Sequence, residues 1–382
     1  MRIQLLTLLA LLQICLVSCT DSVSSEYQSV ETVNEASILL KNEFASHFEI
    51  REFPDYTTLT LIGKGGKSEK YALYKSAKDE LKIPSGLHKI QVPLQNIASL
   101  SCVYTRAFYE LGGLTHIKGI DAVKHHYLDE ISTVFEKGEL LELSMNNQLN
   151  LEKVLEMNPD GLFTYNIDEQ DNHFDKIAKA DIPVIFCTEY LENHPLGKAE
   201  WIKVFALFIG QEAKADSIYS QISQDYKELR ASLILKEEGR KTVFCNAPFF
   251  DAWYLPMSNS FTAQFFKDAG LDYIWKDAEG EGNQSLSIEV ILDKALDADL
   301  WLNSGTYTSY EDLAALDPRM TNFKAFKERT IFNTHKRTRT NFGNDFWEMG
   351  SLHPDLILKD LVAIAYPELV PNHEKVFYQA LK

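Results

Sequence analysis

The sequence predicts an α/β protein of two lobes, each with a parallel sheet flanked by helices, joined by a single long rigid helix. Two observations predict this fold class. From residue 90 onward, short apolar strand patterns alternate with helical patterns, and the alternation breaks once, at a helical stretch over 212–239. Strands that alternate with helices form parallel sheets covered on both faces. At 382 residues the chain is also long enough for two domains.

The first 20 residues, MRIQLLTLLALLQICLVSCT, have the features of a secretory signal. A cation at Arg2 precedes an apolar run that is too short to be read as a membrane span. The ending Leu16-Val17-Ser18-Cys19 resembles the bacterial lipobox, which implies cleavage before Cys19 and a diacylglyceryl group on its sulfur. We therefore expect a signal peptide over 1–18 and a lipidated Cys19 with a flexible tether over 19–44. A plain signal peptide with an incidental cysteine is the alternative.

We expect the first α/β lobe over 45–210. It begins with β-branched and aromatic residues at 47–62 and 71–76, a pattern typical of a β-hairpin. The GKGG between them does not lead into a helix, and Leu61 stands where a phosphate-binding loop needs its first glycine. Further strands are predicted at 92–101, 117–121, 138–144, 160–166 and 182–190, and helices at 105–112, 151–158, 171–180 and 198–210.

The connecting helix is predicted over 211–238, where apolar residues recur at helical spacing. About 25 helical residues span roughly 37 Å, enough to bridge two lobes. The second α/β lobe with a closing helix follows over 239–382. Its strands are predicted at 241–248, 271–275, 298–304 and 330–335, and its helices at 260–270, 287–296, 311–318, 321–329 and 351–369.

One short unit occurs in both lobes, as LNLEKVLEMNPDGLF (149–163) and LSIEVILDKALDADLWL (286–302). Each unit places a glutamate, Glu152 or Glu289, in the first turn of a helix that leads into a strand. The spacing therefore predicts that the two glutamates lie at matching positions on the two lobes. The alternative is a capping preference alone, because the helix dipole favours a carboxylate in the first turn.

Composition and motifs exclude some functions. The net charge of −17 argues against nucleic-acid binding, which needs a basic face. The sequence lacks Gly-x-Ser-x-Gly, His-Glu-x-x-His and Gly-x-Gly-x-x-Gly, so we do not expect an enzyme, and a hydrolase is the weakest alternative. Cys102, Cys187 and Cys245 have no metal-binding spacing and are predicted to be small buried apolar residues; whether any of them pair stays open.

Seven segments together resemble the substrate-binding lipoproteins of iron-siderophore and cobalamin ABC importers, the class III periplasmic binding proteins. The resemblance covers about residues 85–370 and is carried by VPLQNIASLS, ELGGLTHIKGID, LNLEKVLEMNPDGLF, LGKAEWIKVFALFIGQEAKA, WYLPMSNSFTAQFFKDAG, SIEVILDKALDADLWLN and GNDFWEMGSLHPDLILKDL. It implies a ligand in the cleft between two lobes. It also implies that Glu152 and Glu289 dock into arginines of a dimeric permease, where carboxylate–guanidinium pairs give register and on-rate.

Ligand contacts in such a cleft come from strand ends and loops. Aromatic side chains supply rigid apolar area, and arginines supply bidentate contacts to anionic oxygens. The alternatives are core or rim packing for the aromatic residues, and a solvated charge or a salt bridge for the arginines, with Asp345 as a partner. The candidates are Tyr104, Arg106 and Tyr165 from the first lobe, and Trp253, Tyr254, Arg337 and Arg339 from the second.

A bare metal site and a resident cofactor are not expected. His116, His125 and His126 lie in one region of the first lobe, but no second-lobe histidine sits in a matching loop, and His335 is the nearest candidate. The predicted function is a monomeric, lipid-anchored periplasmic protein that delivers a chelated metal compound, a ferric siderophore in the favoured case, to an ABC permease. Alternative ligands are cobalamin and haem. An alternative role is ligand capture beside an outer-membrane receptor, without docking on a permease. A single connecting helix further predicts a small lobe closure.

Overall fold

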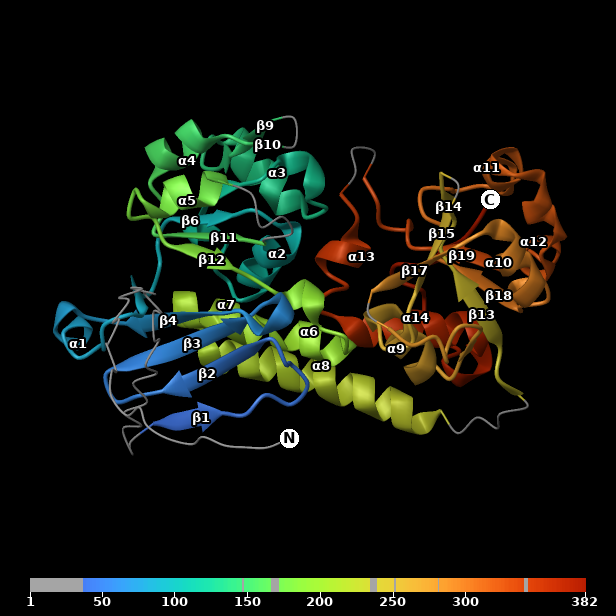
Figure 1. The fold of residues 1–382 in the computed structure, drawn as a ribbon, viewed down its shortest axis with the longest axis horizontal. Coiled ribbons are helices and arrows are strands. Elements are labelled where there is room, and N and C mark those ends of the chain that lie inside the picture. Colours follow the sequence, from blue (N-terminus) through green and yellow to red (C-terminus); the bar gives the residue numbers. More distant parts are fainter. Residues whose placement is uncertain are drawn as a thin grey trace, which may run out of the picture. The chain divides into compact units, whose positions relative to one another are not determined.

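Two mainly parallel sheets organise the described part of the chain (Figure 1). The computed structural model describes residues 37–145, 148–165, 172–233, 239–250, 252–280, 282–339 and 343–382, and these belong to one compact unit. The first lobe is built on the sheet β12-β11-β6-β7-β8, and the second lobe on the sheet β16-β13-β18-β19-β20. The predicted fold class is therefore confirmed.

The central strands of the first lobe are short apolar runs that are buried on both faces, as expected for parallel strands under helices. All its strand pairs are parallel. Its strands are β6 (Ile97–Ser99), β7 (Ile117–Ile120), β8 (Leu141–Glu142), β11 (Gly161–Thr164) and β12 (Val184–Phe186), with a small ribbon of β9 (Ser144–Met145) and β10 (Gln148–Leu149). Its helices are α2 (Cys102–Glu110), α3 (Asp129–Glu136), α4 (Leu151–Met157), α5 (Asn172–Ala178), α6 (Pro195–Glu200) and α7 (Ile202–Ile209).

The second lobe repeats this arrangement. Its main strands are β13 (Thr242–Cys245), β16 (Asp272–Tyr273), β18 (Leu300–Leu302), β19 (Ile331–Asn333) and the antiparallel β20 (Gln379–Ala380). A second, antiparallel sheet holds β14 (Pro248–Phe249), β15 (Ala252–Pro256) and β17 (Asn283–Leu286). The helices are α9 (Phe261–Asp268), α10 (Ile288–Ala295), α11 (Tyr310–Leu316), α12 (Lys324–Lys327), α13 (Asp345–Glu348) and α14 (Pro354–Ala365).

The two sheets share one topology. The order β7-β6-β11-β12 in the first lobe corresponds to β16-β13-β18-β19 in the second, because in each lobe the first strand lies between the second strand and a later one, β11 or β18. Helix α4 leads into β11 and α10 leads into β18, so each helix precedes this later neighbour of the first strand. The repeated sequence unit therefore occupies corresponding positions in the two lobes, as the spacing predicted.

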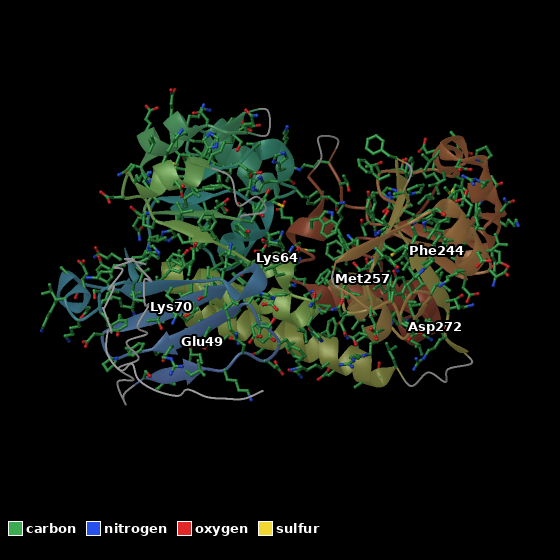
Figure 2. All side chains as sticks on the ribbon, viewed as in Figure 1. Glu49, Lys64, Lys70, Phe244, Met257 and Asp272 are labelled. Carbon is green, nitrogen blue, oxygen red and sulfur yellow. The ribbon has the colours of Figure 1, made fainter. Side chains whose placement is uncertain are left out.

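An aromatic cluster lies in the core of the second lobe. Phe244 lies on β13 in the second lobe (Figure 2), and its side chain is fully buried. Its ring centroid lies 5.0 Å from those of Trp301 and Phe323 and 6.0 Å from that of Trp253. Such ring contacts add to the stability that burial of apolar area gives.

An N-terminal sheet in the order β1-β2-β3-β4-β5 contains the predicted hairpin. Two buried carboxylates attach it: Glu200 accepts hydrogen bonds from the backbone N–H groups of residues 43–45, and Glu192 from those of residues 46 and 47. The tether predicted over 19–44 is thus too long, since residues 38–40 already form a strand. The elements are β1 (Ile38–Leu40), β2 (Phe48–Glu52), β3 (Tyr56–Ile62), β4 (Ser68–Tyr74), α1 (Ala77–Glu80) and β5 (His88–Gln91).

Helix α8 (Glu212–Ser232) contacts α6 and α7 of the first lobe and α14 of the second (Figure 1). Ser223 donates a hydrogen bond to Glu43 at the first lobe, and Tyr226 and Arg230 both bind Asp268 of α9 at 2.8 Å. The described part of the helix ends earlier than the predicted 238, and residues 234–238 lie outside the description. Short 3-10 helices complete the fold: η1 (Lys64–Gly66), η2 (Leu114–His116), η3 (Val123–His125), η4 (Glu189–Leu191), η6 (Pro318–Asn322) and η7 (Pro367–Leu369).

Candidate ligand-binding site

A cavity of about 540 Å³ lies in the second lobe at the carboxyl ends of β13, β18 and β19. These strands are neighbours in the sheet, and an asparagine stands at each of their ends: Asn246, Asn303 and Asn333. All three line the cavity. Ligands of open parallel sheets bind at this edge, where loops diverge from the strand ends.

The three asparagines shape the loops around the cavity. Asn246 and Asn303 have φ of 66° and 58°, a left-handed conformation that asparagine adopts more readily than most residues. The amide of Asn333 donates to the carbonyl oxygens of Gly305 (2.7 Å) and Tyr307 (3.0 Å), and the Tyr378 hydroxyl donates to Asn303 (2.8 Å). The strand ends are therefore fixed by side-chain hydrogen bonds and form a preorganised wall.

Aromatic rings form another wall of the cavity, from Phe261 and Phe265 on α9 and from Phe346 and Trp347 on α13. Trp347 is 55% exposed, so it can change its surroundings when a ligand enters. His335 also lines the cavity, and neither of its ring nitrogens has a hydrogen-bond partner within the described part of the chain. Burial lowers the pKa of His335, so its imidazole is neutral at pH 7.

The described lining of the cavity contains no aspartate or glutamate, although the chain carries 55 acidic residues. Arg339 is the lining residue with a permanent charge. The remaining polar lining is neutral and comes largely from asparagine and threonine, namely Asn246, Thr262, Asn303, Thr306, Thr308, Asn333, Thr334, Thr338 and Asn344. A lining of this kind can donate hydrogen bonds to oxygen atoms and carries positive charge.

Arg339 also joins the two lobes. Its Nε donates to the Tyr127 carbonyl oxygen (2.9 Å), one Nη donates to the Ser132 hydroxyl (3.0 Å), and the other pairs with Asp129. These partners precede or lie in α3 of the first lobe. Of the predicted contacts, Arg339 is the one that lines the cavity, and it does so while bound to the opposite lobe.

Arg106 and Arg337 meet at Asp345, which is fully buried at the start of α13. Arg337 pairs with Asp345 at 2.6 Å, while Arg106 pairs with Glu110 at 2.7 Å and lies 3.9 Å from Asp345. Arg337 does not line the cavity, because its guanidinium is held by Asp345, and a ligand role for it stays a prediction. Both arginines instead compensate the buried charge of Asp345, which is costly without such partners.

Tyr104 and Trp253 are core residues, and their burial contradicts the prediction that they contact a ligand. Tyr104 is buried on α2, and its hydroxyl donates to Glu189 (3.2 Å). Trp253 lies on strand β15, not in the predicted loop, and its Nε1 donates to the Cys245 carbonyl oxygen (2.9 Å).

Tyr165 and Tyr254 are accessible. Their exposed fractions are 42% and 44%, and neither belongs to the cavity lining. Tyr165 directly follows β11, as predicted, and burial raises the pKa of its phenol, so it stays protonated. Tyr254 lies on β15, where its backbone carbonyl accepts a hydrogen bond from Asn246 at 2.7 Å. A ligand role for either tyrosine stays a prediction.

Glu152 and Glu289 both lie in the first turn of their helices and are exposed. Glu289 pairs with Arg319 at 2.7 Å, and Arg319 also pairs with Asp317. The arginine lowers the pKa of Glu289, although the backbone at the helix start is the larger cause. Both carboxylates are thus exposed surface groups at corresponding positions.

Cys102, Cys187 and Cys245 are free thiols, and the latter two are fully buried. The described residues hold no group of three or more His, Cys, Asp or Glu side chains arranged to bind a metal. No helix in the described ranges is long and apolar enough to cross a membrane. Cys19 and the signal segment lie outside the described residues.

Sequence reasoning missed the three strand-end asparagines. The signal was present, because Phe-Cys-Asn, Trp-Leu-Asn and Ile-Phe-Asn each end an apolar strand with the same polar residue. It also did not identify Phe261, Phe346 and Trp347 as lining residues. Their role depends on the positions of α9 and α13 beside the sheet, and no local pattern shows this.

Residues 97–338 match the family described as periplasmic binding protein. A relative in Methanocaldococcus jannaschii, described as an uncharacterized lipoprotein, is 27% identical over 307 residues, which are 78% of this chain and 71% of that protein. The N-terminal sheet precedes the matched region.

Solved structures share the fold. A possible iron-binding periplasmic solute-binding protein from Staphylococcus epidermidis matches with a TM-score of 0.55 and 18% identity, over 72% of this chain and 100% of that chain. A periplasmic heme binding protein from Pseudomonas aeruginosa matches with a TM-score of 0.56 and 16% identity, over 76% and 98%. At these identities the likeness concerns the fold alone.

Proposed function

The chain belongs to the periplasmic binding protein family, and on this premise we propose that it captures a chelated metal compound and delivers it to an ABC permease. A ferric siderophore is the favoured ligand. The metal then arrives already coordinated, and the protein recognises the outside of the chelate.

The observation that carries this proposal is the composition of the cavity lining. In a chain of net charge −17, the described lining has one arginine, many neutral hydrogen-bonding groups and no carboxylate. Exclusion of acidic side chains from one site of an acidic protein removes close repulsion of an anionic ligand. Ferric chelates built from catecholate, carboxylate or hydroxamate groups present oxygen atoms that suit such a lining.

The size of the cavity fits a compound of this class. Its volume of about 540 Å³ lies within the roughly 300–1,000 Å³ that is typical of small-molecule sites. The cavity belongs to the second lobe. Its lining residue Arg339 donates hydrogen bonds to Tyr127 and Ser132 of the first lobe. A ligand that extends beyond the cavity would therefore meet the first lobe next to α3.

A second candidate ligand is a metal macrocycle such as haem or cobalamin. The specific observation is the aromatic wall of Phe261, Phe265, Phe346 and Trp347, which offers flat apolar surface to a planar ring. The neutral imidazole of His335 beside this wall is a group that can bind iron or cobalt.

Anchoring and delivery are further parts of the proposal. A lipid on Cys19 would hold the protein at a membrane surface on the periplasmic side, and the segment between Cys19 and β1 would serve as the tether. Glu152 and Glu289 would then dock on the two halves of a permease dimer. Their matching exposure and their equivalent places in the sheet topology support this; a lipoprotein that captures ligand beside an outer-membrane receptor would not need them.

The ligand is tested by tryptophan fluorescence of the chain from residue 20 onward. The panel contains ferric citrate, ferric catecholate and hydroxamate siderophores, haem and cobalamin, with correction for their absorption. We expect saturable quenching at micromolar or lower concentration by one class. Binding should weaken in Arg339→Ala and stay unchanged in the control Lys336→Ala, whose side chain in the same loop pairs with Glu374 at the surface.

The two ligand classes give different outcomes in this assay. Preference for an iron chelate of acidic groups supports the favoured proposal, whereas binding of haem or cobalamin with dependence on His335 and Trp347 supports the second. No binding by any compound would contradict the metal-chelate proposal and leave the family assignment intact.

A further inference from the structure

Lys198 on α6 has an ammonium group that no hydrogen bond or ion pair satisfies within the described residues. The side chain is only partly exposed, and its Nζ lies 4.6 Å from the centroid of the Phe261 ring. The Nζ atom is not among the solvent-inaccessible unpaired atoms, so it can still be reached. A reachable cation without an anionic partner is unusual in a partly buried position.

Its place in the fold puts Lys198 beside the ligand site. Helix α6 belongs to the first lobe and contacts α9 and α14 of the second. Phe261, the ring that Lys198 contacts, lines the cavity. Lys198 is not itself a lining residue, so its ammonium is a first-lobe group that lies against one ring of the lining.

The two carboxylates whose charges act on Lys198, Glu189 and Glu192, are bound to other groups. Glu189 is buried and accepts a hydrogen bond from the Tyr104 hydroxyl at 3.2 Å. Glu192 accepts from the backbone N–H of Ser46 and His47 and from Trp201 Nε1. Burial lowers the pKa of Lys198, and the charges of Glu189 and Glu192 oppose that shift only from a distance.

We propose that Lys198 is a ligand-binding residue that receives an anionic oxygen, from a carboxylate or catecholate group, of the compound held in the cavity. This inference rests on the proposed function and makes it more specific. An anion beside Lys198 would offset the cost of a desolvated ammonium. With Arg339 on the second lobe, it would give the ligand one cation from each lobe, so an anionic ligand would bind both lobes together.

The alternative is that Lys198 only balances the charge of Glu189. Comparing a trianionic ferric tris-catecholate with a neutral ferric tris-hydroxamate separates the two roles in the full chain in detergent. In Lys198→Met, we expect the affinity for the anionic chelate to fall about tenfold or more, as for loss of a charged hydrogen bond, with at most about a twofold change for the neutral chelate. Lys198→Arg should restore most of the loss.

Lys227→Met is the matched control. Lys227 also lies near an aromatic ring, at 5.2 Å from that of Phe44, but it pairs with Glu43 far from the cavity lining. Its substitution should leave both affinities unchanged. An equal loss for both chelates in Lys198→Met, or no loss for either, would overturn the inference.

A direct readout comes from NMR of the ¹³C-dimethylated lysines, with the Lys198 signal identified by its absence in Lys198→Met. The anionic chelates of the panel, made with gallium in place of iron, should shift this signal and raise the titration midpoint of Lys198. Binding seen by fluorescence without a change in the Lys198 signal would overturn the inference and leave the proposed function standing. Absence of binding by every compound would overturn both.

Discussion

The carboxylate of Glu348 on α13 accepts a hydrogen bond from the backbone N–H of Leu128 in the opposite lobe, at 3.1 Å. It also accepts one from the N–H of Tyr127. Leu128 is the N-cap residue of α3, where backbone N–H groups have no partner inside the helix. Glu348 of the second lobe thus accepts hydrogen bonds from backbone N–H groups at the start of a first-lobe helix. Through these hydrogen bonds, α13 connects the two lobes.

Glu348 makes this junction sensitive to pH. Burial raises the pKa of Glu348 to about 7, and the nearby charge of Asp345 adds to the shift. Because the folded state then binds the proton more tightly than the unfolded state, this group's contribution to stability falls as pH rises from about 4.5 to about 7. Glu348→Gln removes the charge but keeps only one of the two acceptor oxygens. We therefore expect its stability relative to wild type to rise across this window, by on the order of 2–3 kcal/mol between pH 5 and pH 8.

Urea unfolding at pH 5, 6, 7 and 8 measures this difference. Glu156→Gln on the exposed face of α4 serves as the control and should show no such trend. A difference between Glu348→Gln and wild type that stays constant with pH would contradict the prediction.

His353 and Glu110 form a second connection between the lobes, with 2.9 Å between Nε2 and a carboxylate oxygen. Burial opposes ionisation of both groups, but the pairing dominates: it raises the pKa of His353 and lowers that of Glu110. The contribution of a histidine with a raised pKa is complete below about pH 6.5 and disappears as pH rises through the raised value. A double-mutant cycle with His353→Gln and Glu110→Gln should give a coupling free energy of about 1–3 kcal/mol at pH 6 and much less at pH 9. Equal coupling at both pH values would show that the proton on His353 is not involved.

Trp253 and Tyr254 are neighbours on β15 with opposite expected effects. Trp253→Ala removes a fully buried ring and the hydrogen bond to Cys245, so it should lower the free energy of unfolding by about 3–5 kcal/mol. Tyr254→Ala changes a side chain that is 44% exposed and should cost less than about 1 kcal/mol. Chemical denaturation measures both. A ligand defect without loss of stability in Trp253→Ala would reinstate it as a contact residue.

Charge reversal at Glu152 and Glu289 tests permease docking. Glu152→Arg together with Glu289→Arg should abolish transport-dependent uptake while the ligand affinity of the purified chain stays unchanged, because both sites are exposed and distant from the lining. Glu156→Arg and Asp293→Arg, exposed on the same two helices, are the matched controls. Normal uptake in the double variant would favour a lipoprotein that does not dock on a permease. Glu289→Arg alone should reduce uptake less than Glu152→Arg alone, because Arg319 already neutralises part of the charge of Glu289.

Much of the fold could be predicted because helix and strand periods are local properties of the sequence. The two Glu-helix units at 149–163 and 286–302 even revealed the common topology of the sheets. Strand β15 was missed because Ala252–Pro256 is short and contains a proline, both typical of a loop. The helix predicted over 198–210 is divided at Trp201 into α6 and α7, and such a division depends on packing that the apolar pattern does not contain.

The site was harder to predict, because exposure and pairing are tertiary properties. Trp253 and Tyr254 are adjacent, yet only the structure shows which of them is buried. Arg337 and Arg339 are two residues apart in one loop, but Asp345 holds the first while the second lines the cavity and reaches α3. A sequence pattern does not show which of two neighbouring paired arginines lines a cavity.

Lobe closure should be small. Helix α8 is bound to Glu43 in the first lobe and to Asp268 in the second, so bending between the lobes must break hydrogen bonds or curve a continuous helix. The contacts of Arg339 and Glu348 with the start of α3 oppose opening as well. We expect free and ligand-bound crystals to differ by less than about 20° in lobe angle, below a large hinge motion. Spin labels at Glu156 and Asp293 should give one narrow distance distribution in both states, and Arg339→Ala should broaden the distribution of the free protein. A larger angle, or a broad distribution in the free wild type, would show that α8 does not restrain the lobes.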